Sequence, residues 1–517
     1  MEIPAGIFSE IALSLSGGGY RAAAFHLGTL KMLDKLNLLG NVKILSTVSG
    51  GTITGGAYAC WLADGGVNFE KFSESHKEFL FKTHVISKAF EKLSVSLNAN
   101  KNVKMPSLAR SAAQVYSEHY LIKDKTLNSL INGESKQFKE VIFNSTDFRT
   151  GNCFRFQISD NIGIRTGNNR GKVKSEVNKQ IRVADIIVAS SCFPGGFEPI
   201  RFPGDFIWSD DIGIENIRKT LGKDFAEEVP LMDGGVFDNQ GIDSVMNVYR
   251  RKNNEIDLYI ISDTDQRGGN ILESKIKNRK GIITLNQIYL LSILIMLLGA
   301  ITAVALIIDF VFVYKQISFL RAFFLYLIPF IFSSSIALFI GWLRAFSLDK
   351  HQLLSDKTEI EVFERIKNLT IHEFIEFIGS RVLSLSAMTR LVFMKRIRDM
   401  GFNRIYADEN LRKKVIPVLI YDMDNPSKWG PDMRMEEFAP TQQLRDIARL
   451  AENYPTNLWV TTKSEFENLI KCGEATTCFQ ILKYLKQYKT DEINNQTTSI
   501  SKLYNGALNE WSRLKAA

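Results

Sequence analysis

The sequence predicts an α/β fold with a mainly parallel central sheet, interrupted by a transmembrane hairpin of two helices. Three observations lead to this prediction. Short apolar runs alternate with helical patterns in both the first and the last part of the chain. Several of these runs stop at clusters of Gly, Ser or Asp, as strands do at the ligand-binding edge of an open α/β sheet. Two long uncharged runs lie near the middle of the chain.

The first element is a strand at Ile11–Leu15, which is followed by a glycine turn and an Ala- and Leu-rich helix. Gly17, Gly18 and Gly19 form the turn, and Arg21 follows it closely. Glycines before a helix leave backbone N–H groups accessible, so the turn predicts an anion site. An ordinary tight turn is the alternative. The Lys-Ser or Lys-Thr pair of a nucleotide-binding P-loop is missing.

The second element is a strand that ends in a serine-bearing turn. An apolar run stops at Thr47, and Ser49 stands directly before Gly50 and Gly51, where a helix of small residues begins. A strand, a sharp turn and a helix with Ser at the apex form a nucleophile elbow. Thr47 replaces the Gly of the usual pattern. Ser46 is a competing candidate, but Ser49 is preferred because two glycines follow it.

A third stretch supplies a carboxylate. The apolar run that begins at Val229 ends in Asp233, and two glycines follow. A Ser hydroxyl is a poor nucleophile until a base takes its proton, so Asp233 is predicted to be the base opposite Ser49. A simple Asp-Gly turn is the alternative. A hydrolase triad would need a later His, and only His351 and His372 qualify, neither in a glycine-rich or strand-end context.

Together, these stretches resemble the patatin-like phospholipase family. Residues 16–21 resemble its glycine-rich oxyanion loop, in the form found in the cytosolic phospholipase branch. Ser49 matches the family nucleophile, and Asp233 matches the Asp of its D-G-G motif. Residues 189–200 resemble the segment between them, and residues 454–474 resemble a C-terminal piece of bacterial members.

The resemblance implies a patatin-like three-layer α/β/α fold and a lipid acyl hydrolase of the phospholipase A or lysophospholipase type. The family uses a Ser-Asp dyad without His, so Ser49 would attack the ester and Asp233 would take its proton. Gly18 and Gly19 would supply oxyanion N–H groups, and Arg21 would steady the loop or meet a lipid phosphate. No metal and no cofactor are implied. An acyltransferase with the same dyad and a catalytically silent membrane scaffold or effector remain open.

The middle of the chain predicts a membrane anchor. Residues 281–308 and 322–343 carry no charge, and each run provides the roughly 20 apolar residues that a membrane-spanning helix needs. The spans are placed at about residues 286–308 and 322–343. A hairpin buried in a soluble core is the alternative. Basic residues flank the pair, at Lys275, Lys277, Arg279 and Lys280 before it and at Arg344 and Lys350 after it.

These flanks place both termini and the catalytic part in the cytoplasm, at what the resemblance implies is a bacterial cell membrane. Residues 255–265 and 413–424 have the pattern of core strands on either side of the hairpin. The hairpin, residues 281–345, is therefore predicted to interrupt one catalytic domain, composed of residues 1–280 and 346–517.

Composition fits an enzyme that works at an anionic surface. The chain has 517 residues and a formal net charge of +8, which suits an anionic membrane surface. The resemblance implies membrane phospholipids as substrate and partner. No zinc-finger or basic-region pattern supports nucleic acid binding. The 5 cysteines form neither a zinc pattern nor a disulfide framework, and the N-terminus lacks the pattern of a signal peptide. Residues 77–97 fit either a membrane-surface helix or core packing. The sequence leaves the oligomeric state open.

Overall fold

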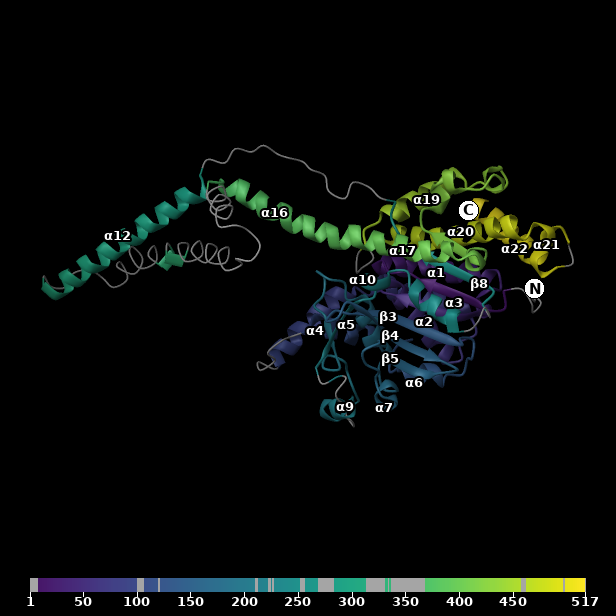
Figure 1. Ribbon diagram of the computed structural model, residues 1–517, viewed down its shortest axis with the longest axis horizontal. Coiled ribbons are helices and arrows are strands. Elements are labelled where there is room, and N and C mark those ends of the chain that lie inside the picture. The colour runs from purple at the N-terminus through teal and green to yellow at the C-terminus, as the bar shows by residue number, and fades with distance from the viewer. Residues whose placement is uncertain are drawn as a thin grey trace. The chain divides into compact units, whose positions relative to one another are not determined.

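The computed structural model divides into two compact units. Unit 1 comprises Met1–Gly269 and Phe393–Ala517, and unit 2 comprises Asn270–Val392 (Figure 1). The residues that the structure describes are 8–99, 107–119, 121–209, 213–221, 225, 227–251, 256–267, 283–312, 331–332, 334–335, 368–456, 462–495 and 498–516.

Within the residues that the structure describes, unit 1 contains a central sheet of nine strands. The strands are β1 Ile11–Leu15, β2 Val42–Val48, β3 Glu140–Asp147, β4 Asn152–Ser159, β5 Gly163–Gly167, β6 Ile200–Phe202, β7 Val229–Asp233, β8 Leu258–Asp263 and β9 Val415–Leu419. Their main order is β5-β4-β3-β2-β1-β8-β9. The strands from β3 to β9 in this order run parallel to one another, whereas β4 and β5 are antiparallel. The predicted α/β fold with a mainly parallel sheet is confirmed.

Two of these strands come from opposite sides of the insertion in the chain. β8 precedes unit 2 and β9 follows it, yet they pair in parallel, with Tyr259 opposite Val415. The strands predicted within residues 255–265 and 413–424 are therefore neighbours in one sheet.

Strand β7 joins the sheet in a way that the sequence pattern does not reveal. It is antiparallel to β3, with Asp233 opposite Ser145. β2 is parallel to β3, with Val48 opposite Asn144. Because β4 occupies the other edge of β3 along its whole length, β2 and β7 share one edge and meet end to end. The last residues of both strands thus converge on one point.

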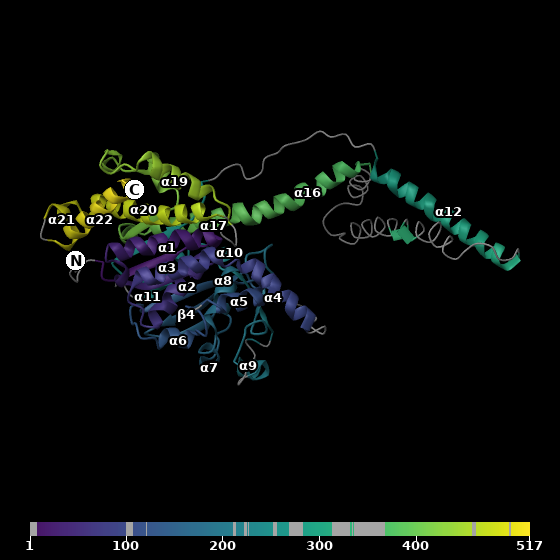
Figure 2. The ribbon, with the colours of Figure 1, turned by 180° about the vertical axis from the view of Figure 1, so that it is seen from behind.

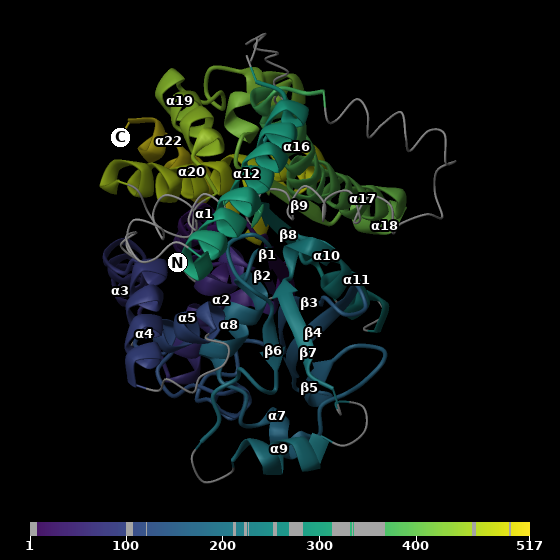
Figure 3. The same cartoon turned by 90° about the vertical axis from the view of Figure 1, so that its left-hand side faces the viewer.

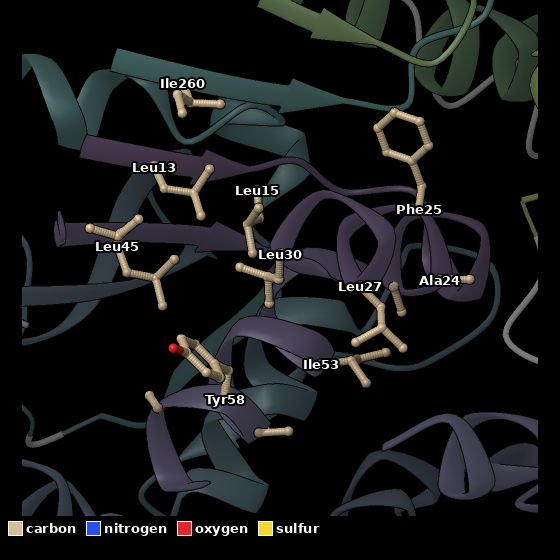
Figure 4. Close-up of a cluster of buried hydrophobic side chains, with 14 of the residues drawn as sticks. Leu13, Leu15, Ala24, Phe25, Leu27, Leu30, Leu45, Ile53, Tyr58 and Ile260 are labelled. Atoms are coloured by element: carbon tan, nitrogen blue, oxygen red, sulfur yellow. The ribbon is translucent and has the colours of Figure 1, made fainter. Parts of the chain in front are cut away.

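Helices cover both faces of the sheet (Figure 3). One face carries α1 Gly19–Lys35, α2 Gly50–Ala63, α5 Leu108–Ser117, α8 Val183–Ser191 and α20 Lys463–Tyr488, and the other carries α11 Ile242–Arg251, α17 Met394–Ala407 and α18 Glu409–Arg412. Strand side chains alternate between the faces, so Leu13 and Leu45 belong to the first core and Ala12 and Ile44 to the second. Figure 4 shows Leu13 and Leu45 beside Leu30 of α1.

The remaining helices of unit 1 surround this layered core. They are α3 Phe69–Lys82, α4 Val85–Ala99, α6 Leu127–Ile131, α7 Ser175–Asn178, α9 Ile214–Leu221, α10 Gly235–Asp238, α19 Gln442–Asn453, α21 Thr490–Asn494 and α22 Ser499–Ala516. The C-terminal helix α20 packs along α1 and against α22 (Figure 2). Residues 77–97 belong to two helices rather than one. Leu80, Val85 and Ala89 are buried in the core there, while Phe90 is half exposed.

In unit 2 the structure describes α12 Leu285–Phe312 and α16 Ile371–Ala387. A bridge between Thr284 and Thr370 joins the starts of these two helices. The first uncharged run coincides largely with α12, whereas residues 322–343 lie almost wholly outside the described residues. Among the residues that the structure describes, no helix combines the length and the apolar character required to cross a membrane.

Candidate active site

Ser49 stands at the apex of a sharp turn between β2 and α2. It is 5% exposed, and its backbone adopts φ 50° and ψ −119°, a region that side-chain-bearing residues rarely occupy. This strained conformation directs a nucleophile away from the strand end, as an elbow requires. A Cβ on Gly50 would overlap the carbonyl oxygen of Gly19, and one on Gly51 would overlap that of Leu15. The elbow can therefore pack against the glycine loop only with glycines at these positions.

Hydroxyl groups beneath the turn explain how Thr47 replaces the usual glycine. Thr47 Oγ1 bonds to Thr52 Oγ1 at 2.9 Å, and Thr52 Oγ1 bonds to Ser190 Oγ at 2.8 Å. The Ser49 N–H donates to Ser190 Oγ at 2.9 Å. The methyl group of Thr47 packs against Gly55, where an added Cβ would lie only 2.5 Å from it. Thr47 therefore supports the turn.

Ser46 has a different set of partners. Its hydroxyl donates to the Gly241 carbonyl at 2.9 Å and accepts from Asn144 Nδ2 at 3.0 Å. These bonds join β2 to β3 and to the start of α11. This arrangement fits a structural hydroxyl, and it favours Ser49 over Ser46 as the nucleophile.

Asp233, the last residue of β7, contacts Ser49 directly. Ser49 Oγ donates to Asp233 Oδ2 at 2.6 Å, and the Gly235 N–H donates to Asp233 Oδ1 at 2.7 Å. Asp233 is 3% exposed. Burial raises the pKa of Asp233 to about 6, although the bonds from Ser49 and Gly235 oppose this rise. A carboxylate with a raised pKa is a stronger proton acceptor than an ordinary Asp.

This raised pKa predicts the acid limb of the pH dependence of ester cleavage. A general base must be deprotonated, so activity should increase as the pH rises through about 6 and fall about tenfold per unit below it. The test is kcat/KM for a soluble ester between pH 4 and 8, with circular dichroism to show that the protein remains folded. An acid limb near pH 4 would contradict the role of Asp233.

The glycine loop faces this dyad. A Cβ on Gly17 would lie 3.1 Å from Ser49 Cβ. The Gly17 N–H donates to the Asn239 carbonyl at 2.8 Å, so this group is occupied. The N–H groups of Gly18 and Gly19 make no hydrogen bond to the residues that the structure describes. Of the three predicted glycines, these two are the candidates for oxyanion donors.

His26 supports the loop from below. The Ser16 carbonyl contacts His26 Nε2 at 2.9 Å and accepts the Gly51 N–H at 3.1 Å. His26 Nδ1 contacts Ser262 Oγ at 2.9 Å. Burial lowers the pKa of His26 to about 4, so the ring is neutral at pH 7. The interaction with Ser16 implies that Nε2 carries its proton.

Arg21 is directed away from solvent. It is 5% exposed, and it donates to the main-chain carbonyls of Glu452 at 3.1 Å, Tyr454 at 2.9 Å and Thr264 at 2.9 Å. Burial, and then the nearby Arg398, lower the pKa of Arg21 to about 10. This placement favours a loop-steadying role over contact with a lipid phosphate.

Two histidines follow Asp233 in the chain, His351 and His372. His372 lies in α16 of unit 2, and His351 is outside the described residues. Over the described residues, His, Cys, Asp and Glu side chains form no group of three or more that could hold a metal ion.

Several residues that shape the site were not predicted. Ser190 and Asn239 lie inside stretches that the sequence already marks, residues 189–200 and 229–243, but nothing in the sequence singles them out. His26 follows the glycine turn within a helical pattern, and Thr264 follows a core strand. Their roles depend on contacts between distant segments.

The chain was compared with family models, curated proteins and solved structures. Residues 13–246 match the family model described as patatin-like phospholipase. No curated protein matches the chain. Human GIVD cytosolic phospholipase A2 is 14% identical over 50% of this chain and 46% of that one, with a TM-score of 0.34.

Two further solved structures show similar levels of likeness. The human enzyme in complex with methyl gamma-linolenyl fluorophosphonate is 12% identical, over 96% of this chain and 59% of that one, with a TM-score of 0.41. VipD from Legionella pneumophila is 12% identical, over 98% of this chain and 90% of that one, with a TM-score of 0.24. The chain thus spans about half the length of the human phospholipase chains that it matches.

Proposed function

We propose that this chain, whose residues 13–246 match the family model described as patatin-like phospholipase, is a membrane-anchored serine hydrolase that cleaves acyl esters of membrane phospholipids. The observation that carries the proposal is the 2.6 Å hydrogen bond from Ser49 Oγ to Asp233 Oδ2. The N–H groups of Gly18 and Gly19, to which no described residue bonds, lie in the loop beside it. A nucleophile, its base and an oxyanion site are the parts that acyl transfer needs.

In the proposed reaction, Ser49 Oγ attacks the ester carbonyl while Asp233 accepts the hydroxyl proton. The negative charge on the carbonyl oxygen is held by the N–H groups of Gly18 and Gly19. The C–O bond to the glycerol breaks, and Asp233 returns the proton to the leaving alkoxide. Water then attacks the acyl-enzyme, again losing a proton to Asp233, and the fatty acid leaves as Ser49 recovers its proton.

The proposal is tested with the purified full-length protein and vesicles of phosphatidylethanolamine and phosphatidylglycerol. Mass spectrometry should detect equal amounts of free fatty acid and lysophospholipid, and neither product should appear with Ser49→Ala. Added glycerol distinguishes a transferase, because acyl-glycerol would then replace free fatty acid. Absence of acyl release and of acyl transfer by the wild type would refute the proposed function.

The anchor is part of the same proposal and rests on residues 281–308 and 322–343, which carry no charge. Leu290, Leu297 and Ile301 of α12 are each more than half exposed, and exposed apolar surface of this kind needs an apolar environment. Since β8 and β9 pair in one sheet, the segment between them must cross a bilayer an even number of times. Two spans satisfy this requirement.

Replacing residues 281–343 with a short flexible linker should release the protein from membranes. We expect a soluble ester to be cleaved within about twofold of the wild-type rate and vesicle lipid at least about tenfold more slowly, because anchoring raises the local concentration of lipid. Flotation and acyl release are the measurements. A Leu-rich hairpin of equal length should restore both properties. A folded truncated protein that still floats with vesicles would show that another element anchors it.

A further inference from the structure

The peptide groups of Gly17 are held from two sides. Its N–H donates to the Asn239 main-chain carbonyl at 2.8 Å, and its carbonyl accepts from Thr264 Oγ1 at 3.0 Å. The Thr264 N–H also donates to Ser16 Oγ at 3.1 Å. Because the next two N–H groups are the candidate oxyanion donors, their direction depends on how Asn239 and Thr264 are held.

One side chain links both of these supports. Arg398 is 11% exposed at its side chain and forms ion pairs with Asp265, and with Asp263 at 3.6 Å. Asp263 and Asp265 are the two neighbours of Thr264 in the chain. With the Asn239 amide oriented so that its oxygen faces the guanidinium, Arg398 Nε donates to that oxygen at 2.9 Å.

We propose that Arg398 is a positioning residue for the oxyanion loop; this inference rests on the hydrolase function proposed above. Arg398 holds Asn239, whose main-chain carbonyl accepts the Gly17 N–H. It also holds the neighbours of Thr264, whose hydroxyl donates to the Gly17 carbonyl. A planar guanidinium suits this task, since its fork of donors can bind an amide and carboxylates at once.

Arg398 also links the two segments of unit 1 that flank unit 2 in the sequence. Thr264 and Asp265 lie just before unit 2 begins at Asn270, and Arg398 lies shortly after unit 2 ends at Val392. The loop is therefore held by the segments through which the chain leaves unit 1 and returns to it. The loop held in this way adjoins the nucleophile, because a Cβ on Gly17 would lie 3.1 Å from Ser49 Cβ.

The test compares Arg398→Met with Arg404→Met. Both arginines lie on α17 and form ion pairs, but Arg404 pairs with Asp243 and is half exposed. For a soluble p-nitrophenyl ester, Arg398→Met should lower kcat by roughly 10- to 100-fold and leave KM within about twofold, because only transition-state stabilisation is lost. Arg404→Met should change kcat less than about twofold, and Arg398→Lys, which keeps the charge, should recover part of the loss.

Two measurements separate this role from a general loss of structure. Titration of Ser49 with a fluorophosphonate counts competent sites, and kcat per titrated site must still fall in Arg398→Met. A loss confined to the number of titrated sites would overturn the proposal. Hydrogen exchange of the Ser16 and Gly17 amides should also become faster in Arg398→Met alone. That readout needs no turnover, so unchanged exchange refutes the positioning role even if the proposed hydrolase activity fails.

Discussion

Replacing Ser49 with Ala should abolish ester cleavage while the protein remains folded. Ser49 Oγ lies 2.6 Å from Asp233 Oδ2 at the apex of the elbow, so no other hydroxyl replaces it in this geometry. A nucleophile and its base act as one unit, so loss of the nucleophile should lower kcat by at least about 10⁴-fold. Acyl release from vesicles and hydrolysis of a soluble ester should both fall to background, and fluorophosphonate labelling should disappear.

Ser46→Ala is the matched control for this variant. Ser46 is also buried, and its hydroxyl bonds to the Gly241 carbonyl and to Asn144. Its removal should lower the free energy of unfolding by about 1–2 kcal/mol and leave kcat per folded molecule near the wild-type value. Full activity in Ser49→Ala together with an inactive Ser46→Ala would identify Ser46 as the nucleophile instead.

Replacing Asp233 with Asn should have an effect of similar size. The amide keeps the shape of the carboxylate and can still accept the Gly235 N–H, which donates to Oδ1 at 2.7 Å. It cannot take the proton of Ser49, so the hydroxyl is not activated. We expect kcat to fall by at least about 10⁴-fold, and the circular dichroism spectrum to match the wild type. The residual rate should also lose the acid limb that Asp233 produces near pH 6.

Asp238→Asn provides the same chemical change at a neighbouring buried carboxylate. Burial raises the pKa of Asp238 to about 6 as well, and its Oδ2 accepts the Asp243 N–H at 2.7 Å. An amide oxygen can keep that bond, so Asp238→Asn should retain most of the activity. Equal losses in both variants would mean that a buried negative charge, rather than a specific base, supports the reaction.

Features that arise from local chemistry can be predicted from the order of the residues alone. Apolar runs of strand length and the glycines behind Ile11–Leu15 are enough to predict a strand, a turn and a helix, because backbone conformation there depends on neighbouring residues. The same kind of local signal, small residues placed directly after strand patterns, predicts Ser49 and Asp233 as site residues. The mainly parallel sheet followed from the spacing of strands and helices.

How these elements meet depends on contacts between segments that are distant in the chain. Strand β7 runs antiparallel to β3 and ends against β2, and no local pattern encodes which way a strand enters a sheet. That end-to-end meeting is what brings Asp233 to Ser49. A contact between distant segments occupies the N–H of Gly17, whereas no described residue accepts a hydrogen bond from the N–H of Gly18 or Gly19.

Arg21 and Arg398 show the same difference between what a local pattern predicts and what tertiary contacts determine. The sequence places Arg21 beside the glycine turn but does not say whether it faces a ligand or the core. The fold directs it to carbonyls of Thr264, Glu452 and Tyr454, all three of which lie at least 243 residues away in the chain. Arg398 follows the predicted hairpin and has no motif around it, yet it reaches Asn239 and Asp265. The partners of a long side chain depend on how distant segments pack around the whole sheet. Turns and the periodic patterns of helices and strands depend only on residues that are close in the sequence.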